Sequence, residues 1–230
     1  MTTAQITSLK KTGRTAGVLI LLIAVIAILS MIFLPANMIV PGDATTTAMN
    51  IAASEGAFRV SIAGDAIIFI LEIVLVVVLY ELLKPVNQSL SLVATFARLA
   101  MAIIQGINLL NYFMVLILVS DAGYLDMFQP DQTQALTMLF LDAHEKVVLI
   151  WGLAFCLHLF VLGYLVYKSG YIPRILGILL IISGLCYFIQ SFGNILLPQY
   201  EQIFTTIGFL SIIELAFPVW LVIKGVKDPS

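Results

Sequence analysis

Six long apolar runs constrain the fold of this chain more than any other feature of its sequence. They cover residues 16–34, 58–83, 90–119, 135–167, 173–197 and 203–223 of the 230-residue chain. A helix of about 20 apolar residues crosses the roughly 30 Å hydrocarbon core of a bilayer. Inside lipid the backbone N–H and C=O groups must pair within their own segment, so each run is expected to be a helix. The sequence therefore predicts an all-α integral membrane bundle of six transmembrane helices, as a single domain over residues 1–230.

The composition agrees with a membrane environment. Hydrophobic residues make up 61% of the chain and charged residues only 10%, whereas about a quarter of the residues in soluble domains are charged. So little charge does not cover this much apolar surface in water, and membrane lipid is the expected partner of most of it. The formal net charge of -2 argues against a nucleic-acid-binding protein, which needs a basic face. The sequence leaves the oligomeric state open.

Basic residues predict the orientation of the chain. Eight of the eleven Lys and Arg residues lie before the first run, after the second, after the fourth and after the last: Lys10, Lys11, Arg14, Lys84, Lys168, Arg174, Lys224 and Lys227. The intervening loops, residues 35–57, 120–134 and 198–202, contain none. Because Lys and Arg accumulate on the cytoplasmic side, we expect both termini to be cytoplasmic. The expected location is the bacterial cytoplasmic (plasma) membrane, the cell inner membrane, as a multi-pass protein.

A short extracytoplasmic surface helix is predicted between the first two runs. Asp43 has the side chain of an N-cap, and Gly56 is a residue of the type that ends helices. We expect this helix to be a structural connector. Gly13 and Gly17, on either side of the start of the first run, are spaced for close packing of helices.

Polar side chains interrupt the second, third and fourth runs, although each charge in a bilayer costs about 2.5–3.5 kcal/mol on insertion scales. The predicted ligand-binding residues are Arg59, Asp65, Glu72, Arg98, Gln105, Asn108, Asp142, His144 and His158. The helical rise of about 1.5 Å per residue predicts two clusters. The inner cluster contains Glu72, Arg98, His158 and Glu214, and the outer cluster contains Arg59, Asp65, Asp142, His144, Glu145 and Lys146.

Two interpretations of these residues are open. In the first, they form neutralising pairs that hold the helices in register, Glu72 with Arg98 and Asp65 with Lys146 or Arg59. In the second, the carboxylates and histidines line a hydrophilic cavity or a proton path. We expect Glu72 and Arg98 to be partners.

The two histidines, His144 and His158, share one face of the fourth helix. Their spacing resembles the ligand pairs of membrane b-type cytochromes, but each haem needs a facing histidine and the chain has no third. About 21 Å of helix rise separates them, so one metal ion does not bind both. No cofactor is therefore predicted. A haem or a single metal ion at His144 or His158 is the alternative.

Four stretches of the sequence resemble a bacterial multi-pass membrane family known as domain of unknown function 4386. They are residues 53–59 (ASEGAFR), 83–88 (LKPVNQ), 140–144 (FLDAH) and 163–177 (GYLVYKSGYIPRILG). The resemblance covers most of the chain and implies a compact multi-pass bundle of this length. It carries over no activity, cofactor or catalytic residue.

Three functions are compatible with these features. The leading hypothesis is a protein that binds or transports a small molecule or a proton through a polar core of helices two to four. An intramembrane enzyme or redox protein that holds a metal, a haem or a lipid-like substrate is the second, although no GxSxG, HExxH, Walker or Rossmann pattern occurs. The third is an accessory membrane protein whose buried ion pairs are purely structural.

Overall fold

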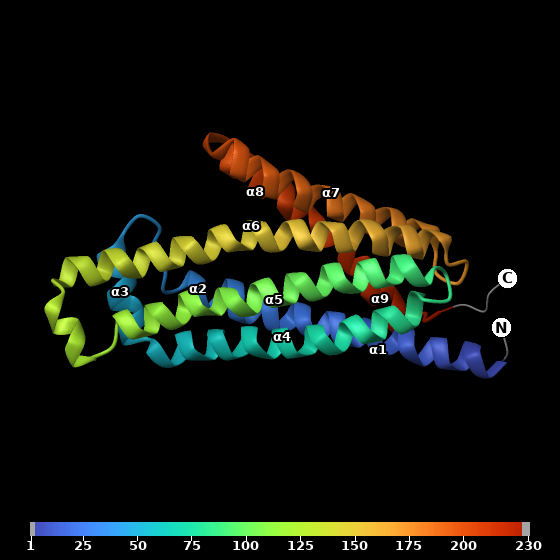
Figure 1. Ribbon diagram of the computed structural model, residues 1–230, viewed down its shortest axis with the longest axis horizontal. Coiled ribbons are helices and arrows are strands. Elements are labelled where there is room, and N and C mark those ends of the chain that lie inside the picture. Colours follow the sequence, from blue (N-terminus) through green and yellow to red (C-terminus); the bar gives the residue numbers. More distant parts are fainter. Residues whose placement is uncertain (1–2, 227–230) are drawn as a thin grey trace. The chain divides into compact units, whose positions relative to one another are not determined.

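The computed structural model describes residues 3–226, so Lys227, one of the basic residues used for the orientation, lies outside the described residues. Within residues 3–226 the secondary structure is helical and contains no strand (Figure 1). The elements are α1 (Thr3–Ala27), η1 (Ile28–Phe33), α2 (Leu34–Ala36), α3 (Ala44–Ala53), α4 (Glu55–Leu83), α5 (Gln88–Leu118), η2 (Gly123–Met127), α6 (Pro130–Lys168), α7 (Arg174–Leu196), η3 (Pro198–Tyr200), α8 (Glu201–Phe209), η4 (Leu210–Leu215) and α9 (Ala216–Ile223).

Six helices in the described part of the chain are long and apolar enough to cross a membrane. They are Ser8–Ala36, Glu55–Leu83, Gln88–Leu118, Pro130–Lys168, Arg174–Leu196 and Pro198–Ile223. The first crossing combines α1, η1 and α2, and the sixth combines η3, α8, η4 and α9. The chain is therefore an all-α multi-pass membrane protein, which confirms the predicted fold class.

The short helix between the first two crossings is α3. Asp43 caps it as expected, because its carboxylate accepts a hydrogen bond of 2.9 Å from the Thr46 N–H. The expectation that Gly56 ends this helix is wrong. Helix α3 ends at Ala53, and Gly56 lies inside α4. The chain re-enters a helix after a single residue, so Gly56 does not occupy the left-handed conformation for which a terminating glycine is needed.

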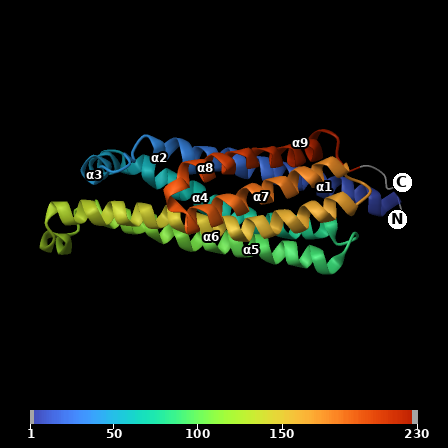
Figure 2. The ribbon, with the colours of Figure 1, turned by 90° about the horizontal axis from the view of Figure 1, so that it is seen from above.

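The chain divides into two compact units, which we describe separately. Unit one comprises the described parts of residues 1–23, 71–103 and 149–230. In this unit the second half of α6 and the first half of α7 run side by side (Figure 1 and Figure 2). A Cβ atom on Gly163 of α6 would lie 2.6 Å from the carbonyl oxygen of Gly177 in α7. The two helices therefore meet backbone to backbone.

A second close approach in unit one joins α1 to the sixth crossing. A Cβ atom on Gly17 would lie 2.8 Å from the carbonyl oxygen of Pro218, and one on Gly13 would lie 2.8 Å from the Val226 side chain. This geometry confirms the close helix packing expected from the two glycines.

Unit two comprises residues 24–70 and 104–148. Its core contains the buried residues Met38, Ile51, Phe58, Ile62, Leu109, Tyr112, Val115, Leu116 and Leu141. Helix α3 contributes Ile51 to this core, and its Thr45 hydroxyl donates to Gln134 Oε1 of α6 at 2.8 Å. Helix α3 therefore packs against the core of unit two and connects the first two crossings.

Candidate functional site

A buried network in unit one joins α4, α5 and α6 through Arg98. Arg98 Nε and Nη2 donate to the two carboxylate oxygens of Glu72, at 2.5 and 2.9 Å. Both side chains are buried, and this two-pronged geometry is the strongest form of a carboxylate–guanidinium pair. The predicted pairing of Glu72 with Arg98 is confirmed. The guanidinium also lies over the Phe155 ring, 5.5 Å from its centre, which adds a cation–π contact.

His158 completes this network, and its neighbours determine where its proton is. Its Nε2 lies 3.1 Å from Arg98 Nη1, and its Nδ1 lies 2.8 Å from the carbonyl oxygen of Ala94. Arginine only donates and a carbonyl only accepts. We therefore assign the neutral form of His158, with the proton on Nδ1 and the Nε2 lone pair facing Arg98. A metal ion or haem iron at Nε2 would have to displace Arg98.

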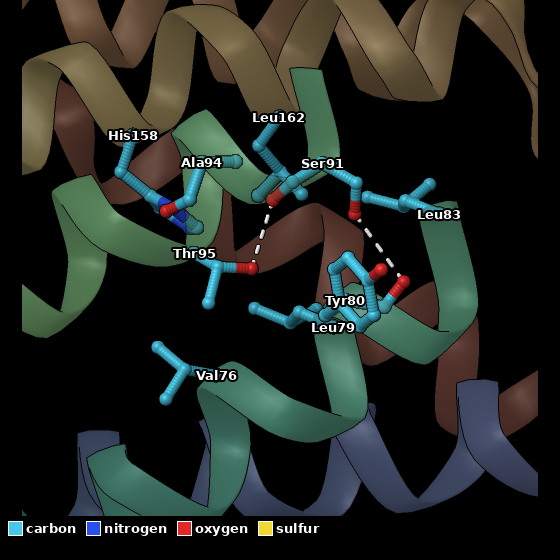
Figure 3. A pocket seen from close by; sticks show the side chains of 9 residues that line it. All are labelled: Val76, Leu79, Tyr80, Leu83, Ser91, Ala94, Thr95, His158 and Leu162. Carbon is cyan, nitrogen blue, oxygen red and sulfur yellow. Dashed lines mark hydrogen bonds between the residues drawn. The ribbon is translucent and has the colours of Figure 1, made fainter. Parts of the chain in front are cut away.

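A narrow pocket lies against His158 (Figure 3). Its lining residues, from α4, α5 and α6, are Val76, Leu79, Tyr80, Leu83, Ser91, Ala94, Thr95, His158 and Leu162. Two of its hydroxyls are bonded to backbone, Thr95 Oγ1 to the Ser91 carbonyl at 2.8 Å and Ser91 Oγ to the Tyr80 carbonyl at 3.2 Å. The free volume of about 10 Å³ is close to the minimum for one water molecule.

Glu214 occupies a break in the sixth crossing, also in unit one. It lies in the 3₁₀ segment η4. Pro218, in α9, has no N–H to donate to the Glu214 carbonyl four residues earlier. The only hydrogen bond to its carboxylate among the described residues is a long contact of 3.5 Å from the Tyr187 hydroxyl to Oε1. Oε2 is buried and has no hydrogen-bond partner.

A neighbouring helix supports this break. The Ser183 hydroxyl of α7 shares its hydrogen between the carbonyl oxygen of Ser211 in η4, at 3.1 Å, and that of Leu179 in its own helix, at 3.0 Å. Tyr187 lies one turn further along α7 and packs edge-on against Phe155 and Trp151 of α6, with ring centres 5.1 and 5.8 Å apart. Glu214 therefore lies beside an aromatic group and within electrostatic reach of Arg98 and Glu72.

A third carboxylate, Asp65 of α4, lies in unit two beside a break in the first crossing. Asp65 has no exposed surface. Its Oδ1 accepts a hydrogen bond of 2.7 Å from the Ser30 hydroxyl, and its Oδ2 accepts a long one of 3.4 Å from Gln105 Nε2. Ser30 lies in the π-helical segment η1. Both donors to Asp65 are neutral groups.

His144 of α6 lies in the same unit as Asp65. Its ring stacks on Tyr112 with centres 3.9 Å apart and planes 10° from parallel. Asn108 Nδ2 donates to the His144 backbone carbonyl at 3.1 Å, and Asn111 Nδ2 donates to Asn108 Oδ1 at 2.9 Å. His144 Nδ1 is buried and has no partner. Within residues 3–226, no group of three or more His, Cys, Asp and Glu side chains is placed to hold a metal ion.

Comparison with known proteins places this sequence in a family. The sequence pattern of the domain of unknown function DUF4386 matches residues 15–225. The chain belongs to this family. A relative from Archaeoglobus fulgidus, described as an uncharacterized protein, is 32% identical over 168 residues, which cover 73% of this chain and 85% of the relative. No solved structure matches the chain. Membership extends through the sixth crossing, so η4 and Glu214 lie within the matched region.

The structure does not bring all the predicted site residues of this DUF4386 chain together. Glu72, Arg98 and His158 share one network, as expected of the inner cluster. Two members of the predicted outer cluster, Arg59 and Asp142, lie at exposed positions. Arg59 is exposed and pairs with Glu55 at 2.6 Å, one turn away on α4, and Asp142 is exposed. The idea that Arg59 neutralises Asp65 is therefore wrong, because the short distance to Glu55 along the same helix satisfies the guanidinium first.

The predicted site did not include the serines and the tyrosine that lie at the breaks in the first and sixth crossings. Ser30 and Ser61 form hydrogen bonds at the break in the first crossing, and Ser183 and Tyr187 form hydrogen bonds to residues at the break in the sixth crossing. A serine followed within a turn or two by a proline, as in Ser30 with Pro35, is the sequence signal that would have found the breaks. Serine is weakly polar, so it does not stand out in an apolar run as a charged residue does.

Proposed function

We propose that this protein is a proton-linked binding or transport protein, in which Glu214 takes up and releases the proton. The observation that carries the proposal is the buried Oε2 atom of Glu214, which has no hydrogen-bond partner. A carboxylate without a counter-charge is very costly in a low-dielectric surrounding. Binding a proton removes that cost, so this group is the natural acceptor.

The neighbouring charges support this assignment. Arg98 is the nearest described cation in the network, but Glu72 binds it through both carboxylate oxygens. His158 is neutral in the tautomer assigned above, so the trio of Glu72, Arg98 and His158 carries no net charge. Glu214 is left uncompensated beside it. Because the trio is neutral as a whole, it offers Glu214 no free cation, and the burial of Glu214 is what favours the protonated form.

The broken backbone gives Glu214 a way to respond to its proton. A 3₁₀ segment inside a longer helix has poorer hydrogen bonds than α-helix and is a frequent site of hinges. Discontinuous membrane helices also form the ion sites of many transporters. The pocket at His158 has room for about one water molecule, which fits proton transfer better than passage of a solute at that point. A small-molecule ligand coupled to the proton is part of this proposal.

The location belongs to the same proposal. Lys and Arg residues concentrate in alternate loops, and this asymmetry supports a cytoplasmic membrane with both termini inside.

Infrared difference spectroscopy on the full-length protein in lipid nanodiscs tests the proposal. Spectra recorded across a pH titration report the carbonyl band of protonated carboxyl groups. We expect a band that the wild type shows and the Glu214→Gln variant lacks. In proteoliposomes that contain a pH-sensitive dye, we expect an imposed membrane potential to drive proton entry in the wild type, and entry in Glu214→Gln to fall to the rate of empty vesicles.

Glu81→Gln is the matched control, because Glu81 is an exposed carboxylate that pairs with Lys84. It should keep both signals. If Glu214→Gln does not fold, Glu214→Asp retains the acid and should shift the band without removing it. An unchanged band in Glu214→Gln, together with unchanged proton entry, would overturn the proposal.

A second candidate function is favoured by one observation. Each of the three nitrogens of the Arg98 guanidinium has a partner within the protein. This is expected of an accessory membrane protein with structural ion pairs. Such a protein predicts no titrating Glu214 band and no proton entry, so the same two measurements separate the candidates.

A further inference from the structure

The surroundings of Asp65 in unit two form a set of oxygen ligands around a single carboxylate. Ser30 Oγ lies 2.7 Å from Oδ1, and the Gln105 amide lies 3.4 Å from Oδ2. The amide contact is longer than the usual 2.7–3.2 Å range for an N–H···O hydrogen bond. Gln105 also carries a carbonyl oxygen, which a rotation of its amide would turn toward Asp65.

The backbone of η1 adds a further oxygen to this set. In the π-helical segment the Leu34 N–H donates to the Leu29 carbonyl, five residues earlier. The next carbonyl, that of Ser30, would need the N–H of Pro35, which proline lacks. The Ser61 hydroxyl of α4 donates to this freed carbonyl at 2.6 Å. Ser30 therefore presents both its hydroxyl and its carbonyl oxygen beside α4.

A close approach of the backbones holds this arrangement in place. A Cβ atom on Gly64 of α4 would lie 2.7 Å from Ser30 Cβ. Only glycine allows η1 to come this near to α4, next to Asp65. Ser30, Ser61, Asp65 and Gln105 are all buried, so the set is shielded on every side.

We propose that Asp65, Ser30, Ser61 and Gln105 form a binding site for Na⁺. The carboxylate supplies one negative charge, and the two hydroxyls, the Ser30 carbonyl and the Gln105 carbonyl supply neutral oxygens. Hard cations prefer such oxygen ligands. Transporters place Na⁺ at freed backbone carbonyls of interrupted membrane helices, the feature that η1 provides.

The charge of the site selects a monovalent ion. One carboxylate balances Na⁺, whereas tight binding of Ca²⁺ uses several. No described group of three acidic or other metal-binding side chains surrounds Asp65. The hydroxyl hydrogens of Ser30 and Ser61 rotate freely, so both oxygens can turn their lone pairs toward a cation. The site lies entirely in unit two and does not rest on the role proposed for Glu214.

The test measures thermal unfolding of the purified full-length protein in detergent, with NaCl exchanged for KCl or choline chloride at constant ionic strength. A ligand that binds only the folded state raises the melting temperature. We expect Na⁺ at a hundredfold excess over its Kd to raise it by about 5 °C or more in the wild type. Asp65→Asn should abolish this shift and Ser61→Ala should reduce it. Asp142→Asn, which changes an exposed carboxylate on α6, should keep the full shift.

Binding of ²²Na⁺ to the wild-type protein, competed with unlabelled Na⁺ or K⁺, supplies a measurement that does not depend on the stability of any variant. Saturable binding that K⁺ competes for poorly supports the site. Equal stabilisation by Na⁺, K⁺ and choline would overturn it, because only ionic strength would then act. A wild type that ignores Na⁺, combined with a more stable Asp65→Asn variant, would also overturn it and would mean that Asp65 holds a proton. Glu214→Gln should leave the Na⁺ shift intact, so this test and that of the proposed function fail independently.

Discussion

At the scale of single residues, the nearest partner decides what each buried acid does. Glu72 is bound through both oxygens by Arg98. Asp65 receives hydrogen bonds from neutral groups, and Glu214 keeps one oxygen without a partner. All three are carboxylates within membrane-crossing helices. Only the first has its counter-charge built in, and for that reason we assign ion binding to the other two.

The Glu72–Arg98 pair gives a prediction for stability. Glu72→Gln and Arg98→Gln should each lower the free energy of unfolding by about 3–5 kcal/mol, because each leaves an unpaired charge in a buried site. The double variant should lose much less than the sum of the two. Denaturation in detergent measures all three values. The exposed pair Glu81–Lys84 is the control and should contribute at most about 1 kcal/mol. Additive losses at Glu72 and Arg98 would contradict the coupling.

Asp43 gives a prediction for pH, outside the membrane-crossing helices. Hydrogen bonds from the Thr46 hydroxyl and from the Thr46 N–H lower the pKa of this carboxyl below its ordinary value of 3.8. The folded pKa is lower than the unfolded one, so the stabilisation is fully present above the unfolded pKa and is lost as pH falls through the folded pKa. Hydrogen-exchange protection of α3 should therefore drop at about pH 3 relative to about pH 6.

Asn is also a good N-cap but does not ionise. Asp43→Asn should therefore keep α3 protected at both pH values, whereas Asp43→Ala should lose protection at both. The same pH dependence in wild type and Asp43→Asn would show that another group is responsible.

At the scale of elements, two crossings are interrupted and the other four are continuous. Both interruptions contain a serine carbonyl that accepts a hydrogen bond from a serine hydroxyl of a neighbouring helix, Ser61 to Ser30 and Ser183 to Ser211. At the first, Pro35 lacks the N–H that would reach the Ser30 carbonyl in the π-helical pattern, and at the second, Pro218 lacks the N–H that would reach the Glu214 carbonyl. Lipid offers no replacement donor, and at the first break the Ser61 hydroxyl supplies one. The two unneutralised acids lie at these two places.

The contact of α6 with α7 gives a prediction for packing. Gly163→Ala should lower the free energy of unfolding by about 1–3 kcal/mol, because its Cβ would lie 2.6 Å from the Gly177 carbonyl oxygen and force the helices apart. Gly56→Ala should act in the opposite direction. Gly56 lies inside α4 with no atom within 4 Å of an added Cβ, so alanine should stabilise by about 0.4–1 kcal/mol. A neutral Gly163→Ala variant would contradict the backbone contact.

At the scale of the whole molecule, the distribution of Lys and Arg predicts which loops face the cytoplasm. Labelling of single introduced cysteines tests this orientation. The two native cysteines, Cys156 and Cys186, are buried and should not react. We expect Ser120→Cys, after α5, to react with a membrane-impermeant maleimide in intact cells. Ser89→Cys, at the start of α5, should react only after the membrane is opened. The opposite result would invert the topology.

The sequence by itself determined the number of crossings and the pairing of Glu72 with Arg98. Both follow from large free-energy costs that apply within a single segment. An unpaired backbone group and an unpaired charge are each costly in hydrocarbon. Run length and helical rise are enough to predict them.

Only the tertiary structure decided which other polar residues lie together. Arg59 turned to Glu55, Asp142 faces outward, and Gly56 lies within α4. The role of the serines at the two broken crossings depends on hydrogen bonds with helices that are distant in sequence. The physical reason is that a serine hydroxyl and a freed carbonyl each contribute little until a neighbouring helix places them within about 3 Å of each other. Sequence spacing along one helix does not contain that distance.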